Sequence, residues 1–349
     1  MIPHNKPTLD IEEEQAAQKV VRSGWLVQSS EVENFEREFC HFLGLPEEHT
    51  VAVTSGTAAL FLALLALQAD EKRVAFPAYV CSSLRHAVAM AGGVEVLLDS
   101  SPDSPNLNPS QLEQEETDLA IIPHLYGLPI DLSSLRNLSI IEDCAQALGA
   151  EYNGKKIGSL GNCGAFSFYP TKNIGAYGDA GAVVTNNVSL YNQLISLRNY
   201  GNVKGDLHQE NGLNSRLDEI QAAILGVKLK YVEEWNSRRI VIGNYYSDNI
   251  KNLELFFLDP NIKHVYHIFA IRSKKRETLM NYLKTSNIET KVHYPTTIHQ
   301  NDFGHSLNMS NYHKSTLLAN EVMSIPINPW LTENEILTVI NSINEFKNG

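Results

Sequence analysis

The sequence predicts an α/β protein, built from a large domain with a mainly parallel, mixed sheet and a smaller α+β domain at the C-terminal end. Through the first half of the chain, short apolar runs of strand character alternate with helical patterns. Such alternation is typical of parallel strands with helices on both faces of the sheet. The length of 349 residues also exceeds one typical core and favours two domains. We place these domains at residues 1–235 and 236–349.

Two helices with one apolar face each are predicted before the first strand. Asp10 with Glu13 is a capping signal for a helix that ends at Gly24, and Ser30 with Glu33 repeats the signal. Strands then follow at residues 51–53, 73–76, 94–98, 119–122, 139–141, 165–168 and 182–185, and helices begin at Thr57 and Ser82.

One long helix is predicted before the second domain. It begins near Asn214 or Ser215 and reaches Trp235, because apolar residues recur along one stripe of this segment. The smaller domain is then predicted to contain strands at 267–272 and 290–294 and helices near 277–285, 315–323 and 333–346.

The composition argues against several classes of partner. Lys and Arg number 28 against 40 Asp and Glu, so the net charge of -12 argues against nucleic acid or a membrane surface as a partner. The longest apolar run, residues 58–67, is about half of a membrane span. The first residues lack the pattern of a secretory signal, and we expect a cytoplasmic protein. Cysteines and histidines lack the spacing of zinc sites, so we expect no bound metal.

Lys172 is the first candidate for catalysis. It follows the apolar and aromatic run Phe166–Tyr169 and Pro170, and the glycine-punctuated segment 175–181 comes next. A lysine at such a turn after a buried strand can point into a cleft and form a Schiff base. An isolated lysine is more often an ordinary solvated loop residue. Its interpretation therefore depends on the rest of the chain.

Two further segments support a catalytic role for Lys172. The first predicted strand is followed by Ser55, Gly56 and Thr57 at a helix start, where free N–H groups and hydroxyls favour a phosphate. A later apolar strand carries Asp143 to the carboxyl edge of the sheet, where α/β proteins bind ligands. A phosphate site, a carboxylate for a protonated ring nitrogen and a Schiff-base lysine together indicate pyridoxal phosphate.

The ordered motifs of the chain resemble those of the DegT-type sugar-nucleotide aminotransferases. This family is a branch of the aspartate-aminotransferase-like, fold-type I pyridoxal phosphate enzymes, and the resemblance spans nearly the whole chain. The matching segments are Gly24–Gln28, Ser55–Leu60, Pro77–Tyr79, Glu142–Ala150, Phe166–Asn173, Arg198–Gly201, Gly212–Ala223 and His293–Pro295.

The resemblance implies a role for each matching residue around the cofactor. Lys172 would form the Schiff base and then move protons, Asp143 would hold the ring nitrogen, and Gln146 would lie near the ring. Tyr79 would stack on the ring. Phosphate contacts are implied for Gly56, Thr57, Ser167 and, from the neighbouring subunit, Asn214. The active unit would therefore be a homodimer with shared active sites.

The resemblance also implies where the substrate binds. His293 and Tyr294 would border the sugar pocket, although each could instead be an ordinary strand residue. Tyr177 and Trp25 are further candidates for the same pocket.

The implied activity is a transamination in deoxyamino sugar biosynthesis, of the kind that supplies O-antigen and other lipopolysaccharide sugars. L-Glutamate would be the amino donor and a dTDP-linked 4-keto-6-deoxy sugar the acceptor, as in the synthesis of dTDP-4-amino-4,6-dideoxyglucose. The segment Ser55–Leu60 resembles the C-4 enzymes, whereas Asn214–Glu219 is similar to many C-3 enzymes. Amination of a 3-keto sugar is therefore the alternative. A non-catalytic sensor or regulatory protein that kept the fold is the alternative of another class.

Overall fold

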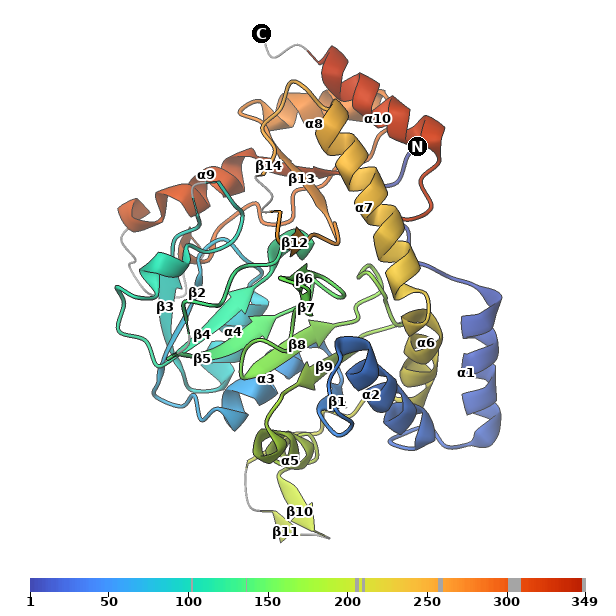
Figure 1. Cartoon of the computed structure of the whole chain (residues 1–349), viewed down its shortest axis with the longest axis vertical. Coiled ribbons are helices and arrows are strands. Elements are labelled where there is room, and N and C mark those ends of the chain that lie inside the picture. The colour runs from blue at the N-terminus through green and yellow to red at the C-terminus, as the bar shows by residue number, and fades with distance from the viewer. Residues whose placement is uncertain are drawn as a thin grey trace.

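The computed structural model describes residues 1–101, 103–135, 137–204, 207–208, 211–256, 260–300 and 309–346, and its centre is a seven-stranded sheet (Figure 1). The strand order is β1 (Thr50–Val53), β9 (Gly181–Val184), β8 (Cys163–Ser167), β5 (Ser139–Asp143), β4 (Leu119–Pro123), β2 (Arg73–Pro77) and β3 (Val94–Leu98). β9 runs antiparallel to both of its neighbours, and the other adjacent pairs are parallel. The predicted α/β class with a mainly parallel, mixed sheet is thus confirmed.

Helices cover both faces of this sheet. One layer contains α3 (Gly56–Ala66), α4 (Ser83–Met90) and α5 (Val188–Leu197). The other layer contains α2 (Ser30–Leu43) and α6 (Glu219–Leu229), and α1 (Ile11–Ser23) packs against α6. In this second layer, Phe39 of α2 meets Phe166 of β8 edge to face, with 5.0 Å between ring centroids. The predicted strand–helix alternation therefore builds a three-layer unit.

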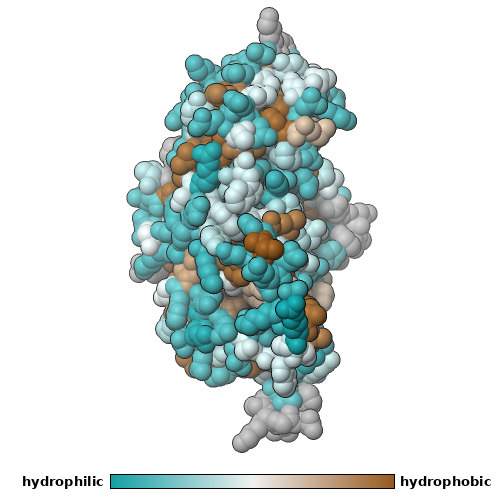
Figure 2. Space-filling model, turned by 90° about the vertical axis from the view of Figure 1, so that its right-hand side faces the viewer, coloured by the Kyte–Doolittle hydropathy of each residue, from teal (hydrophilic) through white to brown (hydrophobic). Residues whose placement is uncertain are grey.

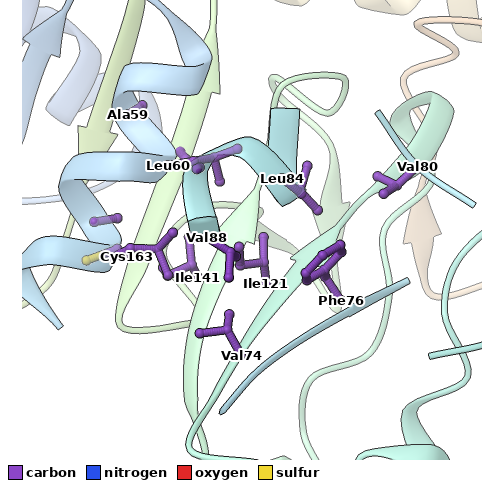
Figure 3. Close-up of a cluster of buried hydrophobic side chains, with 14 of the residues drawn as sticks. Ala59, Leu60, Val74, Phe76, Val80, Leu84, Val88, Ile121, Ile141 and Cys163 are labelled. Atoms are coloured by element: carbon purple, nitrogen blue, oxygen red, sulfur yellow. The ribbon is translucent and has the colours of Figure 1, made fainter. Parts of the chain in front are cut away.

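The core between the sheet and the first helical layer is made of apolar side chains from both. Phe76 of β2, Ile121 of β4 and Ile141 of β5 are fully buried and lie opposite Leu60 of α3 and Leu84 of α4 (Figure 3). Burying each such side chain stabilises the fold by about 1.5–3 kcal/mol. This core fixes the helix and strand ends from which the site is built.

A separate apolar cluster holds the C-terminal part of the chain together. β13 (Phe269–Arg272) and β14 (Val322–Ile325) pair antiparallel, and the cluster includes Ile2 from the start of the chain. The helices of this part are α7 (Val232–Asn249), α8 (Arg276–Thr285), α9 (His313–Glu321) and α10 (Glu333–Glu345). In Figure 1 they lie above the central sheet.

Short elements complete the described chain. They are β6 (Glu151–Tyr152), β7 (Lys155–Lys156), β10 (Asn202–Lys204), β11 (Leu207–His208), β12 (Ile262–Lys263) and the 3-10 turns η1 (Pro109–Gln111), η2 (Leu125–Gly127), η3 (Ile298–Gln300) and η4 (Met309–Tyr312). Within the described ranges, no helix combines the length and the apolar character needed to cross a bilayer.

The single long helix predicted from Asn214 or Ser215 is in fact two helices. The Ser215 N–H donates to Arg198 O at 3.0 Å, so the segment before α6 is held outside the helix. Between α6 and α7, the Lys230 and Tyr231 N–H groups bond the carbonyls three residues earlier, which tightens the backbone into a turn. The boundary that we placed at residue 235 falls within α7. The division into two domains stays a prediction.

Two smaller expectations were also wrong. The segment 290–294 is not a strand, because its pairing consists of an isolated bridge between Lys291 and Ser324. The helix α2 begins at Ser30, so its N-cap is Ser29, and the Ser29 side chain makes no capping hydrogen bond. Instead, the buried Glu219 carboxylate accepts hydrogen bonds from the N–H groups of Ser29, Glu31 and Val32 at 2.6, 2.9 and 3.1 Å. The carboxylate of a residue far away in the sequence therefore caps α2.

Candidate active site

A cavity of about 360 Å³ opens at the carboxyl edge of the sheet, within the size range of small-molecule sites. The strands β1, β8, β5 and β4 run parallel to one another in the sheet and end at this edge. Several residues predicted from the sequence line the cavity together, namely Gly56, Thr57, Asp143, Gln146, Ser167, Lys172, His293 and Tyr294. They come from segments far apart in the chain.

The end of the cavity at α3 has the features of a phosphate site. Ser55 caps the helix by accepting a hydrogen bond from the Ala58 N–H at 3.1 Å. The N–H groups of the following residues, Gly56 and Thr57, belong to the first turn and have no partner within the helix. A Cβ on Gly56 would lie 2.7 Å from the Cβ of Ser167, so only glycine lets the helix start approach β8 this closely. The start of α3 beside Ser167 can therefore bind an anion such as a phosphate.

Asp143 and Lys172 line the same cavity. Asp143 ends β5, is 9% exposed and accepts the Ala145 N–H at 3.0 Å. Burial raises the pKa of its carboxyl, while the Ala145 N–H and Lys172 act in the other direction. Burial lowers the pKa of the Lys172 ammonium, and Asp143 opposes this shift. A lysine that loses its proton more readily is a better nucleophile and proton acceptor.

The backbone turn that presents Lys172 is tight. Its N–H donates to Tyr169 O at 2.8 Å across Pro170. Gly175 closes the turn, because a Cβ there would lie 2.4 Å from Pro170 O. The turn thus explains why Pro170 and Gly175 occur in this segment of the sequence.

Gln146 is fixed by hydrogen bonds at both ends of its amide. Its Oε1 accepts the Tyr126 N–H at 2.6 Å, and its Nε2 donates to the Tyr294 hydroxyl at 2.7 Å. Burial raises the pKa of Tyr294 well above its usual value, so this hydroxyl stays neutral. The structure therefore joins Gln146 and Tyr294, which are 148 positions apart in the sequence.

Four predicted site residues lie outside this cavity. Tyr79 is 1% exposed, and its hydroxyl meets the Tyr126 hydroxyl at 2.7 Å. Trp25 is 70% and Tyr177 is 40% exposed, and Asn214 also lies on the surface. The roles of all four stay predictions, and the three surface residues are placed where a second chain could reach them.

The cavity also contains residues that the sequence did not indicate. They are His4, Asn5, Cys81, His124 and Lys291, among others. Asn5 Nδ2 donates to the carbonyl of Thr171, next to Lys172, at 2.8 Å. Both His4 and Asn5 belong to an N-terminal segment without a helical or strand pattern. No local signal could have placed them at the site.

From the sequence, the candidates for binding an anionic substrate are Lys204, Arg216, Arg238 and Arg239, and none of them lines the cavity among the residues that the structure describes. Arg216 bonds Asn214 at 2.8 Å, and Arg238 and Arg239 donate to the backbone carbonyls of Leu331 and Ile327 at 3.1 and 3.2 Å. The Lys204 side chain lies outside the described part of the chain. Among the described residues, the lysines that line the cavity are Lys172 and Lys291.

The cavity contains a lysine and a buried carboxylate, and a helix start that Gly56 keeps open lies beside them. This arrangement fits pyridoxal phosphate. Gly56, Thr57 and Ser167 would hold its phosphate, Asp143 its ring nitrogen and Lys172 its aldehyde carbon. When bound, the cofactor supplies the carbon that takes up an amino group and a ring that stabilises negative charge. The fold and the site thus define a pyridoxal phosphate enzyme of the aminotransferase class.

The chain belongs to the DegT/DnrJ/EryC1/StrS aminotransferase family, whose sequence model matches residues 7–344. This confirms the resemblance and the predicted cofactor. The protein is therefore a pyridoxal phosphate-dependent sugar aminotransferase.

Individual relatives match along almost their entire length. The chain is 38% identical over 347 residues to the erythromycin biosynthesis sensory transduction protein EryC1 of Saccharopolyspora erythraea, covering 95% of this chain and 94% of the relative. It is also 38% identical, with the same coverage, to a dTDP-3-amino-3,6-dideoxy-alpha-D-galactopyranose transaminase of Aneurinibacillus thermoaerophilus. The crystal structure of DesV from S. venezuelae is 35% identical and superimposes with a TM-score of 0.91, over 96% of this chain and 94% of DesV.

Proposed function

We propose that the protein transfers the amino group of L-glutamate to a dTDP-linked keto-6-deoxy sugar. The observation that carries this proposal is Lys172 facing Asp143 in one cavity, with Gly56 at the helix start beside them. The dTDP-sugar transaminase among the relatives supports the substrate class. Deoxyamino sugar biosynthesis, including that of lipopolysaccharide, is the process we propose for the product.

The residues of the cavity have distinct tasks in this reaction. Lys172 would hold the cofactor and then move a proton to and from the substrate carbon, a task that its lowered pKa suits. Asp143 would favour a protonated ring nitrogen, because a carboxylate stabilises a positive charge beside it. Gln146 and Tyr294, held by each other, form a polar wall beside these groups.

The position of the new amine has two candidates. The Aneurinibacillus thermoaerophilus relative carries a 3-amino product in its name, which supports C-3. The resemblance of Ser55–Leu60 to C-4 enzymes supports the position that we predicted first. Each keto-sugar should be incubated with enzyme and L-glutamate, and the product identified by NMR. Failure to aminate either sugar would remove the substrate proposal.

Lys291 is the residue that we propose for the anionic group of a substrate. Its side chain is exposed and lines the cavity near His293 and His4. Lys172 is committed to the cofactor, so Lys291 is the lysine of the cavity lining left for the diphosphate of the sugar substrate. An ammonium of this kind can bind a phosphate group as a point charge.

We further propose that the enzyme works as a homodimer. Trp25, Leu26 and Val27 are 70, 49 and 48% exposed in succession. The face seen in Figure 2 is mainly hydrophilic, with separate apolar groups between the polar ones. A run of exposed apolar side chains is typical of an interaction site. Tyr177 and Asn214 are exposed as well, and we propose that the second chain also contacts them.

Lys172→Ala tests the catalytic proposal directly. The variant should fold, lose transamination and lose the absorbance of lysine-bound cofactor. Lys274→Ala, which removes an exposed lysine outside the cavity, is the matched control and should keep full activity. A non-catalytic sensor is the second candidate function, because one relative is named a sensory transduction protein. That candidate predicts no absorbance of bound cofactor in the wild type and no loss of function in Lys172→Ala.

A further inference from the structure

Ser324 joins two histidines that line the cavity. His4 Nε2 lies 2.7 Å and His293 Nε2 lies 2.9 Å from the Ser324 hydroxyl oxygen. The two ring centroids are 5.4 Å apart, and Ser324, in β14, is 1% exposed. The contact between His4 and Ser324 spans 320 positions of the sequence. Three distant segments therefore meet at one buried hydroxyl.

The N-terminal segment is fixed firmly enough to present His4 at this point. Ile2 exchanges backbone hydrogen bonds with Asn287 and Glu289, at 2.7 and 3.0 Å. The His4 N–H donates to the Glu289 carboxylate at 2.8 Å. These three contacts, together with the burial of Ile2, hold the backbone before His4, and the His4 carbonyl accepts the Ile327 N–H at 3.4 Å. The ring is consequently part of the cavity wall.

The hydrogen atoms available to the cluster limit how the rings can be protonated. A serine hydroxyl donates one hydrogen and can accept two. Its third neighbour is Lys291 O, at 3.0 Å, which already accepts the Ser324 N–H at 2.8 Å. The serine hydrogen therefore goes to one of three acceptors: Lys291 O, His4 Nε2 or His293 Nε2. In the first two cases His293 must donate its own Nε2–H to Ser324.

Two of the three possible acceptors leave His293 as the donor. Lys291 O lies within reach of the Ser324 hydroxyl at 3.0 Å, and the 2.9 Å contact between His293 and Ser324 is typical of an N–H donor. Burial also lowers the pKa of both rings, to about 4 for His4 and about 3 for His293. Each ring is therefore neutral near pH 7 and carries a single N–H. When that hydrogen of His293 is on Nε2, its Nδ1 has a free lone pair.

We propose that His4 and Ser324 are positioning residues that hold His293 in the Nε2–H form, so that Nδ1 accepts a hydrogen bond from a hydroxyl of the sugar substrate. The inference rests on the proposed function and adds a specificity element to it. A neutral acceptor suits a sugar hydroxyl and repels the lone pairs of a carboxylate. The cluster should therefore act on the sugar half of the reaction and leave the glutamate half unchanged.

The tautomer can be measured on the full-length wild-type protein without substrate. Histidine nitrogen NMR of labelled protein should show His293 with a protonated Nε2 and an unprotonated Nδ1, and His293→Gln identifies the signal. A protonated Nδ1 in the wild type would overturn the inference. The tautomer measurement does not depend on activity. If no keto-sugar is converted, that outcome contradicts the proposed function and leaves the tautomer of His293 testable.

Kinetics of the two half-reactions test the positioning role. Ser324→Ala and His4→Leu should raise the KM for the keto-sugar about 3- to 10-fold, the effect of one lost hydrogen bond. The conversion of bound cofactor by L-glutamate, followed by absorbance, should keep its rate. His4→Gln retains an amide that can bond Ser324 and should restore the low KM. His41→Leu, at an exposed histidine, is the control.

Two outcomes would contradict the positioning role. One is a KM for the keto-sugar that is unchanged in both Ser324→Ala and His4→Leu. The other is an equal loss in both half-reactions that His4→Gln fails to restore, because general damage to the fold would produce it.

Discussion

The burial of His4 predicts a measurable loss of stability in acid. Burial lowers its pKa from the ordinary 6.5 to about 4; nearby Lys291 lowers it further, and Glu289 opposes the shift. The folded pKa lies below the unfolded one, so the unfolded chain takes up the proton first as the pH falls. The stability that the neutral ring contributes is fully present above pH 6.5 and is lost progressively toward about pH 4.

The size of this effect follows from the shift. Complete protonation corresponds to about 3 kcal/mol of unfolding free energy, of which about 2 kcal/mol is lost between pH 7 and pH 5. His4→Gln removes the titrating group and keeps an amide beside Ser324. The variant should therefore lose about 2 kcal/mol less than the wild type over the same pH interval.

Urea unfolding of both proteins at pH 7 and pH 5 provides the measurement. His41→Gln, with a side chain that is 61% exposed, is the matched control and should keep the wild-type pH dependence. Equal losses of unfolding free energy in the wild type and His4→Gln would refute the reasoning, because the histidine would then be as easily protonated in the folded state as in the unfolded one.

Three further substitutions test the site and the fold. Gly56→Ala should weaken cofactor binding, measured by absorbance titration, because the new Cβ meets Ser167 at 2.7 Å; Gly226→Ala, with 3.8 Å to its nearest neighbour, should be tolerated. Asp143→Asn should slow the glutamate half-reaction about 100-fold or more, and an unchanged rate would remove its role at the ring. Glu219→Gln should lower the unfolding free energy by about 1–3 kcal/mol, measured in urea, through weaker capping of α2.

Much of the cofactor side of the cavity could be predicted because it is encoded locally. Gly56 follows β1, Asp143 ends β5 and Lys172 follows β8, so each residue has its own strand pattern to mark it. Parallel strands end at a common edge, and their last residues meet without further information. The side chain of Tyr79 also follows a strand but is buried beside Tyr126, because the orientation of a residue after a strand depends on its packing.

The helix before the second domain shows where periodicity fails. The apolar stripe continues from Val227 to Tyr231 and Trp235, yet the backbone turns at Lys230 and Tyr231 before α7 begins. Ile224 of α6 and Trp235 of α7 are both buried, so the same pattern serves two successive helices as well as one straight helix. The capping of α2 by Glu219 could not be predicted from local sequence patterns either, because the capping hydrogen bonds join residues 187 to 190 positions apart.

The cluster of His4, Ser324 and His293 has implications for the choice between amination at C-3 and at C-4. The segment Ser55–Leu60, whose resemblance suggested C-4, surrounds the helix start, where it would meet the phosphate of the cofactor. A phosphate contact is the same for both sugars and cannot select between their carbonyl positions. His4, Ser324 and His293 contact one another through segments without local patterns. Regiochemistry should therefore respond to changes in this histidine cluster more than to changes in the phosphate turn. If substitutions confined to Ser55–Leu60 moved the new amine from one carbon of the sugar to the other, this assignment would be contradicted.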